Sequence, residues 1–166
     1  MQKIMASLSQ ILSSYRDLGL LIFRLGLGGM FMWHGFPKIA GGVAKWTALG
    51  KTMSVFGISF APAFWGFMSG FTEFFGGLLL ALGLFYRPIC VLLAGNMAVA
   101  FTSQMLEGKG LFKASQSLED GFSFLGALFV GPGKYSLDQI LGFNAEHGSL
   151  QDNRITNGAS IMQPKL

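Results

Sequence analysis

The sequence predicts an all-α integral membrane protein, a four-helix bundle preceded by a short amphipathic N-terminal helix. Hydrophobic residues make up 51% of the 166-residue chain and charged residues only 12%, about half the charged share of a typical soluble domain. Long apolar runs recur along the chain, and the mean hydropathy is +0.51. The chain is also rich in Phe (17) and Gly (24), which suit lipid-facing and helix-packing surfaces.

The chain divides into three parts. Residues 1–17 are predicted to form an amphipathic interfacial segment, because residues 4–15 place apolar side chains at helical spacing between Ser and Gln. Residues 18–143 form the transmembrane domain. Residues 144–166 are polar and are predicted to be a disordered tail. Residues 1–17 lack the basic start and apolar core of a signal peptide, so the first apolar run is expected to stay as an anchor.

Length and helix-breaking residues define the spans. A run of about 20 apolar residues crosses a ~30 Å hydrocarbon core at 1.5 Å per residue. Pro37 is expected to end the first span together with the Gly41-Gly42 pair, and Arg87-Pro88 is expected to connect the second span to the third. The predicted spans are residues 18–36, 62–86, 88–106 and 118–131. The longer connections are a surface loop with a partial amphipathic helix at 43–60 and a polar loop at 107–117.

Small residues predict where the spans pack together. Gly66 and Gly70 form a GxxxG pair in the second span, and Gly26 and Gly29 are expected to give a similar close helix contact in the first. Packing within one bundle explains them better than a dimer motif does.

Charge and cysteine content exclude several classes of protein. The net charge of +4 comes from scattered basic residues, so nucleic-acid binding is excluded and the charges are assigned to loops and membrane edges. Cys90 is the single cysteine, so an intramolecular disulfide, a Cys-x-x-Cys pair and a zinc cluster are all excluded. No metal site is predicted, because His34 has no partner histidine within the spans.

Orientation follows from the basic residues of the connections. With four spans, the termini share a side with six basic residues, against five on the other side. Because cytoplasmic loops carry an excess of Lys and Arg, both termini are predicted to be cytoplasmic, in the inner (plasma) membrane. The basic residues of the terminal side are Lys3, Arg16, Arg87, Lys134, Arg154 and Lys165; those of the other side are Lys38, Lys45, Lys51, Lys109 and Lys113.

Polar residues inside the spans are the candidate functional groups, since ionisable side chains at membrane depth need a partner, a cavity or a ligand. Arg24 lies at a depth of roughly 9 Å from the terminal side, and Glu73 lies near the middle of the second span. We expect Arg24 and Glu73 to form a buried ion pair. Asn96 falls near the level of Arg24 and is expected to hydrogen-bond across helices.

The half of the bundle away from the termini gathers the remaining polar groups. The candidates for ligand binding or proton transfer are His34, Glu73 and Gln104, with Lys38 and Glu119 or Asp120 at the mouth of the site. Trp33 and Trp65 are expected to anchor at the interface or to wall such a site. The alternative is a closed core in which these residues bond only to one another.

The chain resembles the DoxX family of small bacterial membrane proteins. The carriers of that resemblance are Arg24, His34-Gly35-x-x-Lys38, Glu73-x-x-Gly76-Gly77-Leu78, Gly83-Leu84-x-x-Arg87 and Gly131-Pro132-Gly133-x-Tyr135-Ser136-Leu137-Asp138. The resemblance implies a four-helix bundle and an association with redox chemistry. Some relatives are linked to thiosulfate:quinone oxidoreduction, and others to membrane complexes that join superoxide detoxification to thiol metabolism.

Three functional hypotheses remain open. The first is a redox-associated membrane subunit, part of a quinone-linked oxidoreductase complex if enzymatic, whose polar interior binds a quinone or a sulfur compound. The second is a non-enzymatic scaffold in the lipid bilayer that anchors soluble or membrane redox partner proteins. The third is a small-molecule or proton-coupled transporter that uses Glu73 and His34. Because Cys90 is alone, electron transfer would need a bound quinone or a partner's cofactor.

Overall fold

The computed structural model describes residues 1–143, and this part of the chain is helical with no strand. The all-α prediction is therefore confirmed, while the predicted disordered tail lies outside the described residues. In chain order the elements are α1 (Gln2–Ser14), α2 (Arg16–Ile39), α3 (Gly42–Gly50), the 3-10 helix η1 (Lys51–Phe56), α4 (Pro62–Leu82), α5 (Tyr86–Leu106), α6 (Gly110–Val130) and α7 (Leu137–Ile140).

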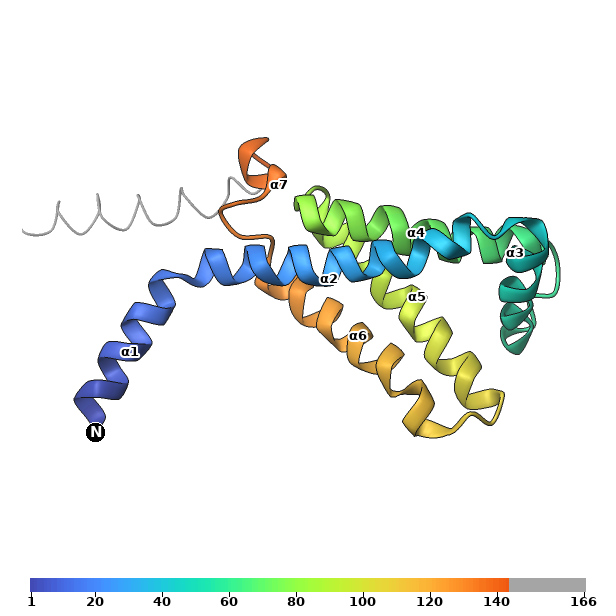
Figure 1. Cartoon of the computed structure of the whole chain (residues 1–166), viewed down its shortest axis with the longest axis horizontal. Coiled ribbons are helices and arrows are strands. Elements are labelled where there is room, and N and C mark those ends of the chain that lie inside the picture. Colours follow the sequence, from blue (N-terminus) through green and yellow to red (C-terminus); the bar gives the residue numbers. More distant parts are fainter. Residues whose placement is uncertain (144–166) are drawn as a thin grey trace, which may run out of the picture.

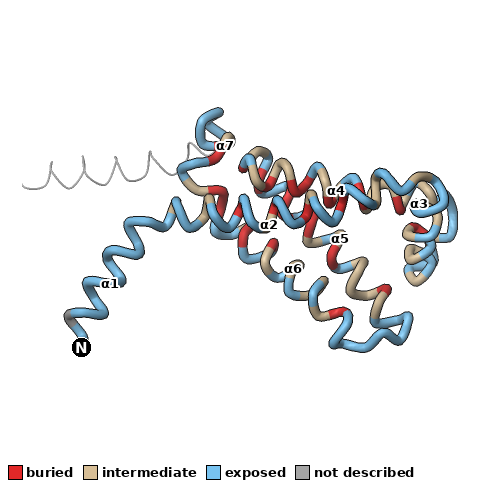
Figure 2. The backbone as a smooth tube through the Cα atoms, in the orientation of Figure 1, coloured by how far each residue is buried: buried red, intermediate tan, exposed pale blue. Residues whose placement is uncertain are grey.

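Two antiparallel helix pairs make up the bundle. Helix α2 packs along α4, helix α5 packs along α6, and α4 contacts α5 to join the pairs. Figure 1 shows the two pairs diverging toward the end of the bundle where α3 lies. Helix α1 leaves the bundle at the opposite end and is exposed from Ile4 to Ser14 (Figure 2). The helix is formed as expected, and its place at the membrane interface stays a prediction.

Glycines set the register between α2 and α4. A Cβ built on Gly28 would lie 2.5 Å from the Gly77 carbonyl oxygen, and one built on Gly77 would lie 2.6 Å from the Gly28 carbonyl oxygen. Real side chains cannot occupy those positions, so the two backbones touch directly. Gly26 and Gly29 have no neighbouring atom within 4 Å of such a Cβ, so the expected contact at these two residues is wrong. The packing face of the first span runs through Gly28 instead.

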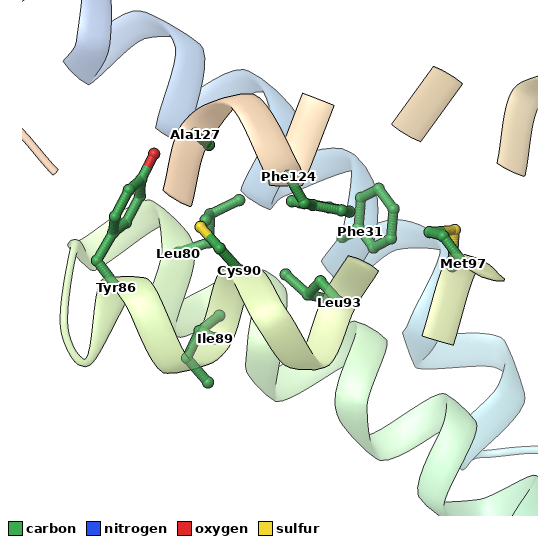
Figure 3. Close-up of a cluster of buried hydrophobic side chains, with 9 residues drawn as sticks. All are labelled: Phe31, Leu80, Tyr86, Ile89, Cys90, Leu93, Met97, Phe124 and Ala127. Atoms are coloured by element: carbon green, nitrogen blue, oxygen red, sulfur yellow. The ribbon is translucent and has the colours of Figure 1, made fainter. Parts of the chain in front are cut away.

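An apolar core fills the centre of the bundle. Phe31 of α2 and Phe124 of α6 meet edge to face, with ring centroids 4.8 Å apart, and both are buried. Cys90 is fully buried in the same cluster, which fits its behaviour as a small apolar residue. Figure 3 shows the nine core side chains, which are Phe31, Leu80, Tyr86, Ile89, Cys90, Leu93, Met97, Phe124 and Ala127.

Two predicted boundaries are wrong. Helix α2 continues through Pro37 to Ile39, because Pro37 removes one N–H while the Ala40 amide still bonds to the Phe36 carbonyl at 2.9 Å. The polar loop at 107–117 is mostly helix, since α6 begins at Gly110. Tertiary contacts stabilise this extra helix: Ala114 is fully buried, and Ser117 accepts a hydrogen bond from Gln104 of α5 at 2.9 Å.

Three of the described helices, α2, α4 and α5, are long and apolar enough to cross a membrane. Helix α6 has the same length as α4 and α5, 21 residues, and at 1.5 Å per residue it extends about 30 Å. Its charged residues Lys113, Glu119 and Asp120 lie in its first half. Large apolar side chains are exposed on the bundle surface, including Trp33 (76%) and Phe129 (83%), as a lipid-facing surface requires.

Topology reporters test whether α6 crosses the membrane. Fusions after Ala40, Phe85, Gly108 and Phe143 are expected to alternate between the two sides, because each site ends one of four antiparallel helices. Alkaline phosphatase and a fluorescent protein provide complementary readouts. The same side for fusions at Gly108 and Phe143 would mean that α6 does not cross.

Candidate functional site

A buried ion pair lies at the centre of the candidate site. Glu73, near the middle of α4, is only 3% exposed, and both of its carboxylate oxygens accept a hydrogen bond from Lys38 Nζ at 2.5 Å. Asn96 Nδ2 of α5 also donates to Glu73 Oε1 at 3.1 Å. The Lys38 side chain remains 28% exposed. Three helices therefore share one carboxylate whose charge is compensated by the lysine.

The local sequence explains how Lys38 reaches Glu73. Lys38 lies in the last turn of α2, and a Cβ built on Gly70 of α4 would lie 2.9 Å from the Lys38 Cβ. The absence of a side chain at Gly70 lets the lysine pass along α4. The Trp46 indole N–H of α3 bonds to the Lys38 carbonyl at 2.9 Å, which fixes the end of α2 that carries the lysine.

Two cavities open on either side of this ion pair. The larger has a volume of about 410 Å³ and is lined by α4, α5, α3 and η1, with Trp65, Asn96, Glu107 and Lys109 among its residues. The smaller has a volume of about 190 Å³ and includes His34, Gln116 and Asp120. The two cavities share a wall formed by four residues that line both of them: Lys38, Glu73, Ala100 and Gln104.

The structure brings most of the predicted site residues together. His34, Lys38, Glu73, Gln104 and Asp120 line the smaller cavity. His34 is exposed, Asp120 is half-buried, and the Gln104 amide donates to the Ala100 carbonyl as well as to Ser117.

Two of the predicted residues lie elsewhere. Glu119 is exposed and Asp120, one residue further along α6, takes the place at the cavity. Of the two tryptophans, Trp65 lines the larger cavity and Trp33, which is 76% exposed, lines neither.

Trp65, which lines the larger cavity, has an unpaired hydrogen-bond donor. Its indole nitrogen is buried and has no hydrogen-bond partner among residues 1–143. An indole N–H is a donor only, and leaving it unpaired away from water costs about 1–3 kcal/mol. An acceptor atom that reached this nitrogen would remove that cost.

The expected Arg24–Glu73 ion pair is wrong. Arg24 is buried, 1% exposed, but its Nη2 donates to the Tyr135 carbonyl at 2.6 Å. The register of α2 on α4 explains the difference: with Gly28 against Gly77, Arg24 falls beside Gly83, roughly 15 Å along the helix from Glu73. Asn96, which we expected near the level of Arg24, bonds across helices to Glu73.

Arg24 belongs instead to a second polar cluster at the end of the bundle near the N-terminus of α2. Asp138 accepts hydrogen bonds from the backbone N–H groups of Phe85 and Tyr86 at 2.8 and 2.9 Å, and its own amide donates to the Gly83 carbonyl at 2.9 Å. Ser136 caps α7. The segment 135–138 is thus fastened to the α4–α5 turn. Sequence reasoning assigned no role to Ser136 and Asp138, although a Ser before Leu-Asp is a helix-start signal.

These features define an integral membrane protein: a four-helix bundle with three apolar spans and a compensated ion pair inside it. The DoxX family model matches residues 19–104, just over half of the chain, and the chain belongs to the DoxX family. The match covers Lys38, Glu73 and Asn96, and the segment 135–138 lies beyond it.

A curated relative agrees with this assignment. The inner membrane protein YqjF of Escherichia coli (strain K12) is 29% identical over 128 residues, which cover 75% of this chain and 93% of that protein. No solved structure gives a significant match.

The ion pair predicts a specific pattern of stability. Glu73→Gln is expected to lower the free energy of unfolding by roughly 3 kcal/mol, because it leaves the Lys38 ammonium without its counter-charge in a largely buried position. Combining it with Lys38→Met should recover most of that loss. The matched control is Glu107→Gln, which breaks the exposed Glu107–Lys109 pair and should change stability by less than about 0.5 kcal/mol. Denaturant unfolding in detergent measures all three; equal losses for Glu73→Gln and Glu107→Gln would contradict the assignment.

Gly83 provides a test of the Arg24 cluster. Its φ of +66° is in the left-handed region, and a Cβ there would collide with the Arg24 guanidinium. Gly83→Ala is therefore expected to destabilise the protein by about 1–3 kcal/mol, seen as a lower melting temperature. Gly126→Ala is the control: Gly126 lies inside α6, and an added methyl group there would have no atom within 4 Å, so alanine should stabilise the helix by up to about 1 kcal/mol. A tolerated Gly83→Ala would disprove the close packing.

Proposed function

We propose that this DoxX-family protein is a redox-associated membrane subunit that binds the head group of a quinone in the larger cavity. The observation that carries the proposal is the cavity of about 410 Å³ that Trp65 lines together with the Lys38–Glu73–Asn96 cluster; the buried Trp65 indole N–H has no partner among residues 1–143. That volume lies within the range of about 300–1,000 Å³ common for small-molecule sites.

The cavity wall suits a flat ring with two carbonyl acceptors. Met53, Met68, Leu92 and Val99 supply apolar surface, as most ligand sites do. In this proposal the Trp65 indole turns toward the cavity, and its N–H, which has no partner among residues 1–143, donates to one acceptor. Lys38 has three ammonium hydrogens and uses two hydrogen bonds on Glu73, so one hydrogen remains for a second acceptor.

Charge favours a quinone over a sulfur anion. Glu73 neutralises Lys38 at the cavity wall, so that pair offers no uncompensated cation to an anion such as thiosulfate. A neutral ligand that only accepts hydrogen bonds avoids the cost of burying an unpaired charge. A neutral sulfur compound remains a second ligand class for the same donors.

Reduction of a bound quinone takes two electrons and two protons. With Cys90 as the one cysteine of the sequence, and that thiol buried in the apolar core, we propose that the electrons come from a soluble or membrane redox partner protein. The protons would pass through the smaller cavity, where His34 and Asp120 are suited to proton transfer.

A proton-coupled transporter is the second candidate function. The observation that favours it is the position of the Lys38–Glu73 pair on the common wall of two cavities, because breaking that pair would join them. A scaffold for redox enzymes is the third, and it needs no ligand in either cavity.

We also propose that the termini face the cytoplasm. The ends of the helices on that side carry Arg16, Arg87 and Lys134, and cationic connections favour the cytoplasmic side. The fusions after Phe85 and Phe143 report this orientation directly.

Quinone binding to the purified protein in lipid nanodiscs tests the leading proposal. A short-tailed ubiquinone analogue is expected to bind the wild type, and Trp65→Phe should weaken binding about 5- to 10-fold, the effect of one lost hydrogen bond of about 1–1.5 kcal/mol. Trp33→Phe, the matched control outside both cavities, should bind like the wild type. Calorimetry measures the affinities.

The remaining outcomes separate the alternatives. A wild type that binds no quinone, together with proton-coupled solute uptake in proteoliposomes, would favour the transporter. The absence of both would favour the scaffold. Equal weakening by Trp65→Phe and Trp33→Phe would contradict the larger cavity as the site.

A further inference from the structure

A third cavity lies at the opposite end of the bundle, away from the Lys38–Glu73 pair. Its volume is about 440 Å³. Its charged wall residues are Arg16, Asp17, Arg87 and Lys134, which come from the first turn of α2, the first turn of α5 and the loop after α6. We propose that this cavity binds the phosphodiester head group of an anionic phospholipid. The proposal is independent of the quinone site.

The position of the three cations matches the head-group layer. Arg16 is the first residue of α2, Arg87 the second of α5, and Lys134 follows the end of α6 by four residues. These helix ends share one end of the antiparallel bundle (Figure 1). Basic pockets between transmembrane helices at this level are typical sites for anionic lipid head groups.

The cations are available to an anion. In residues 1–143 the ion pairs are Lys38–Glu73 and Lys109–Glu107, so Arg16, Arg87 and Lys134 form none there. Asp17, the carboxylate on the wall, accepts a hydrogen bond from the Lys134 backbone amide at 3.0 Å. It thereby holds the loop in place, and three cations against one carboxylate leave the cavity positive.

The loop after α6 holds the site together. Gly131 and Pro132 are buried, and a Cβ built on Gly131 would lie 3.8 Å from Arg87 Nη2. The positive φ of Gly131 (+82°) and Gly133 (+77°) turns the chain sharply there, as glycine allows. This turn sets Lys134 and Arg87 on the same cavity.

The apolar part of the wall distinguishes a lipid from a free anion. Phe129 and Val130 line the cavity and are also exposed on the surface of α6, Phe129 by 83%. Because α6 lies in the bundle with this surface outward, acyl chains can extend along it while the phosphate sits among the cations. A free phosphate would use only the polar half of this wall.

The test is lipid binding to the full-length protein, measured by native mass spectrometry from detergent. Phosphatidylglycerol is expected to bind the wild type more tightly than phosphatidylcholine. The triple variant R16Q/R87Q/K134Q should lose affinity for phosphatidylglycerol, at about fivefold per cation and roughly 100-fold in all. The control K45Q/K51Q/K113Q removes the same charge from the other end of the bundle and should change the affinity less than about twofold.

Single variants separate a loss of lipid binding from a loss of folding. If the triple variant has a lower melting temperature, the single variants Arg16→Gln and Lys134→Gln, at exposed positions, should each lose about fivefold with an unchanged melting temperature. Equal binding of the two lipids to the wild type, or equal losses in both triple variants, would overturn the proposal. Displacement of phosphatidylglycerol by millimolar inorganic phosphate would assign the site to a free anion and overturn it as well.

Discussion

The direct backbone contact between α2 and α4 determines where the buried charges of this protein lie. Gly28 and Gly77 approach each other so closely that neither can carry a side chain, and this fixes the sliding position of the two helices. One consequence appears at each end: Lys38 reaches Glu73, and Arg24 reaches the α4–α5 turn beside Gly83. A shift of one helical turn, about 5.4 Å, would separate Lys38 from Glu73 and Arg24 from the Tyr135 carbonyl, and would leave the buried Glu73 carboxylate without a counter-charge.

The polar groups form two clusters with an apolar core between them. Tyr86 and Met97 lie at opposite ends of that core (Figure 3), with Arg24 and Asp138 beyond the first and the ion pair beyond the second. The two ends differ chemically. At the Arg24 end, hydrogen bonds fasten the segment 135–138 to Arg24 and to the α4–α5 turn, whereas the ion pair borders two cavities. Hydrogen bonds join separate segments at both ends of the core, but the cavities that border the buried Glu73 carboxylate lie at one end only.

The sequence predicted the parts of this fold that depend on composition. Apolar length identified α2, α4 and α5, and the cost of charge in lipid identified Arg24 and Glu73 as buried. The sequence could not identify the partner of Glu73. Membrane depth can be counted along each helix separately, but this count does not give the register of one helix against another. Nor could the sequence predict that residues 110–117 are helical, since the burial of Ala114 and the packing of α6 on α5 outweigh their polar composition. Which residues of two helices meet is a tertiary property. The periodicity and charge pattern of a single sequence do not determine it.

The hydrogen bonds from the Trp46 indole to the carbonyls of Lys38 and Ile39 tie α3 to the last turn of α2. Helix α3 also packs on α4, the helix that carries Glu73, and a Cβ on Gly50 of α3 or on Gly66 of α4 would collide with the backbone of the other helix. Helix α3 therefore contacts both helices that supply the ion pair. The separation of Lys38 and Glu73 is maintained by this third helix as well as by the attraction between the two charges.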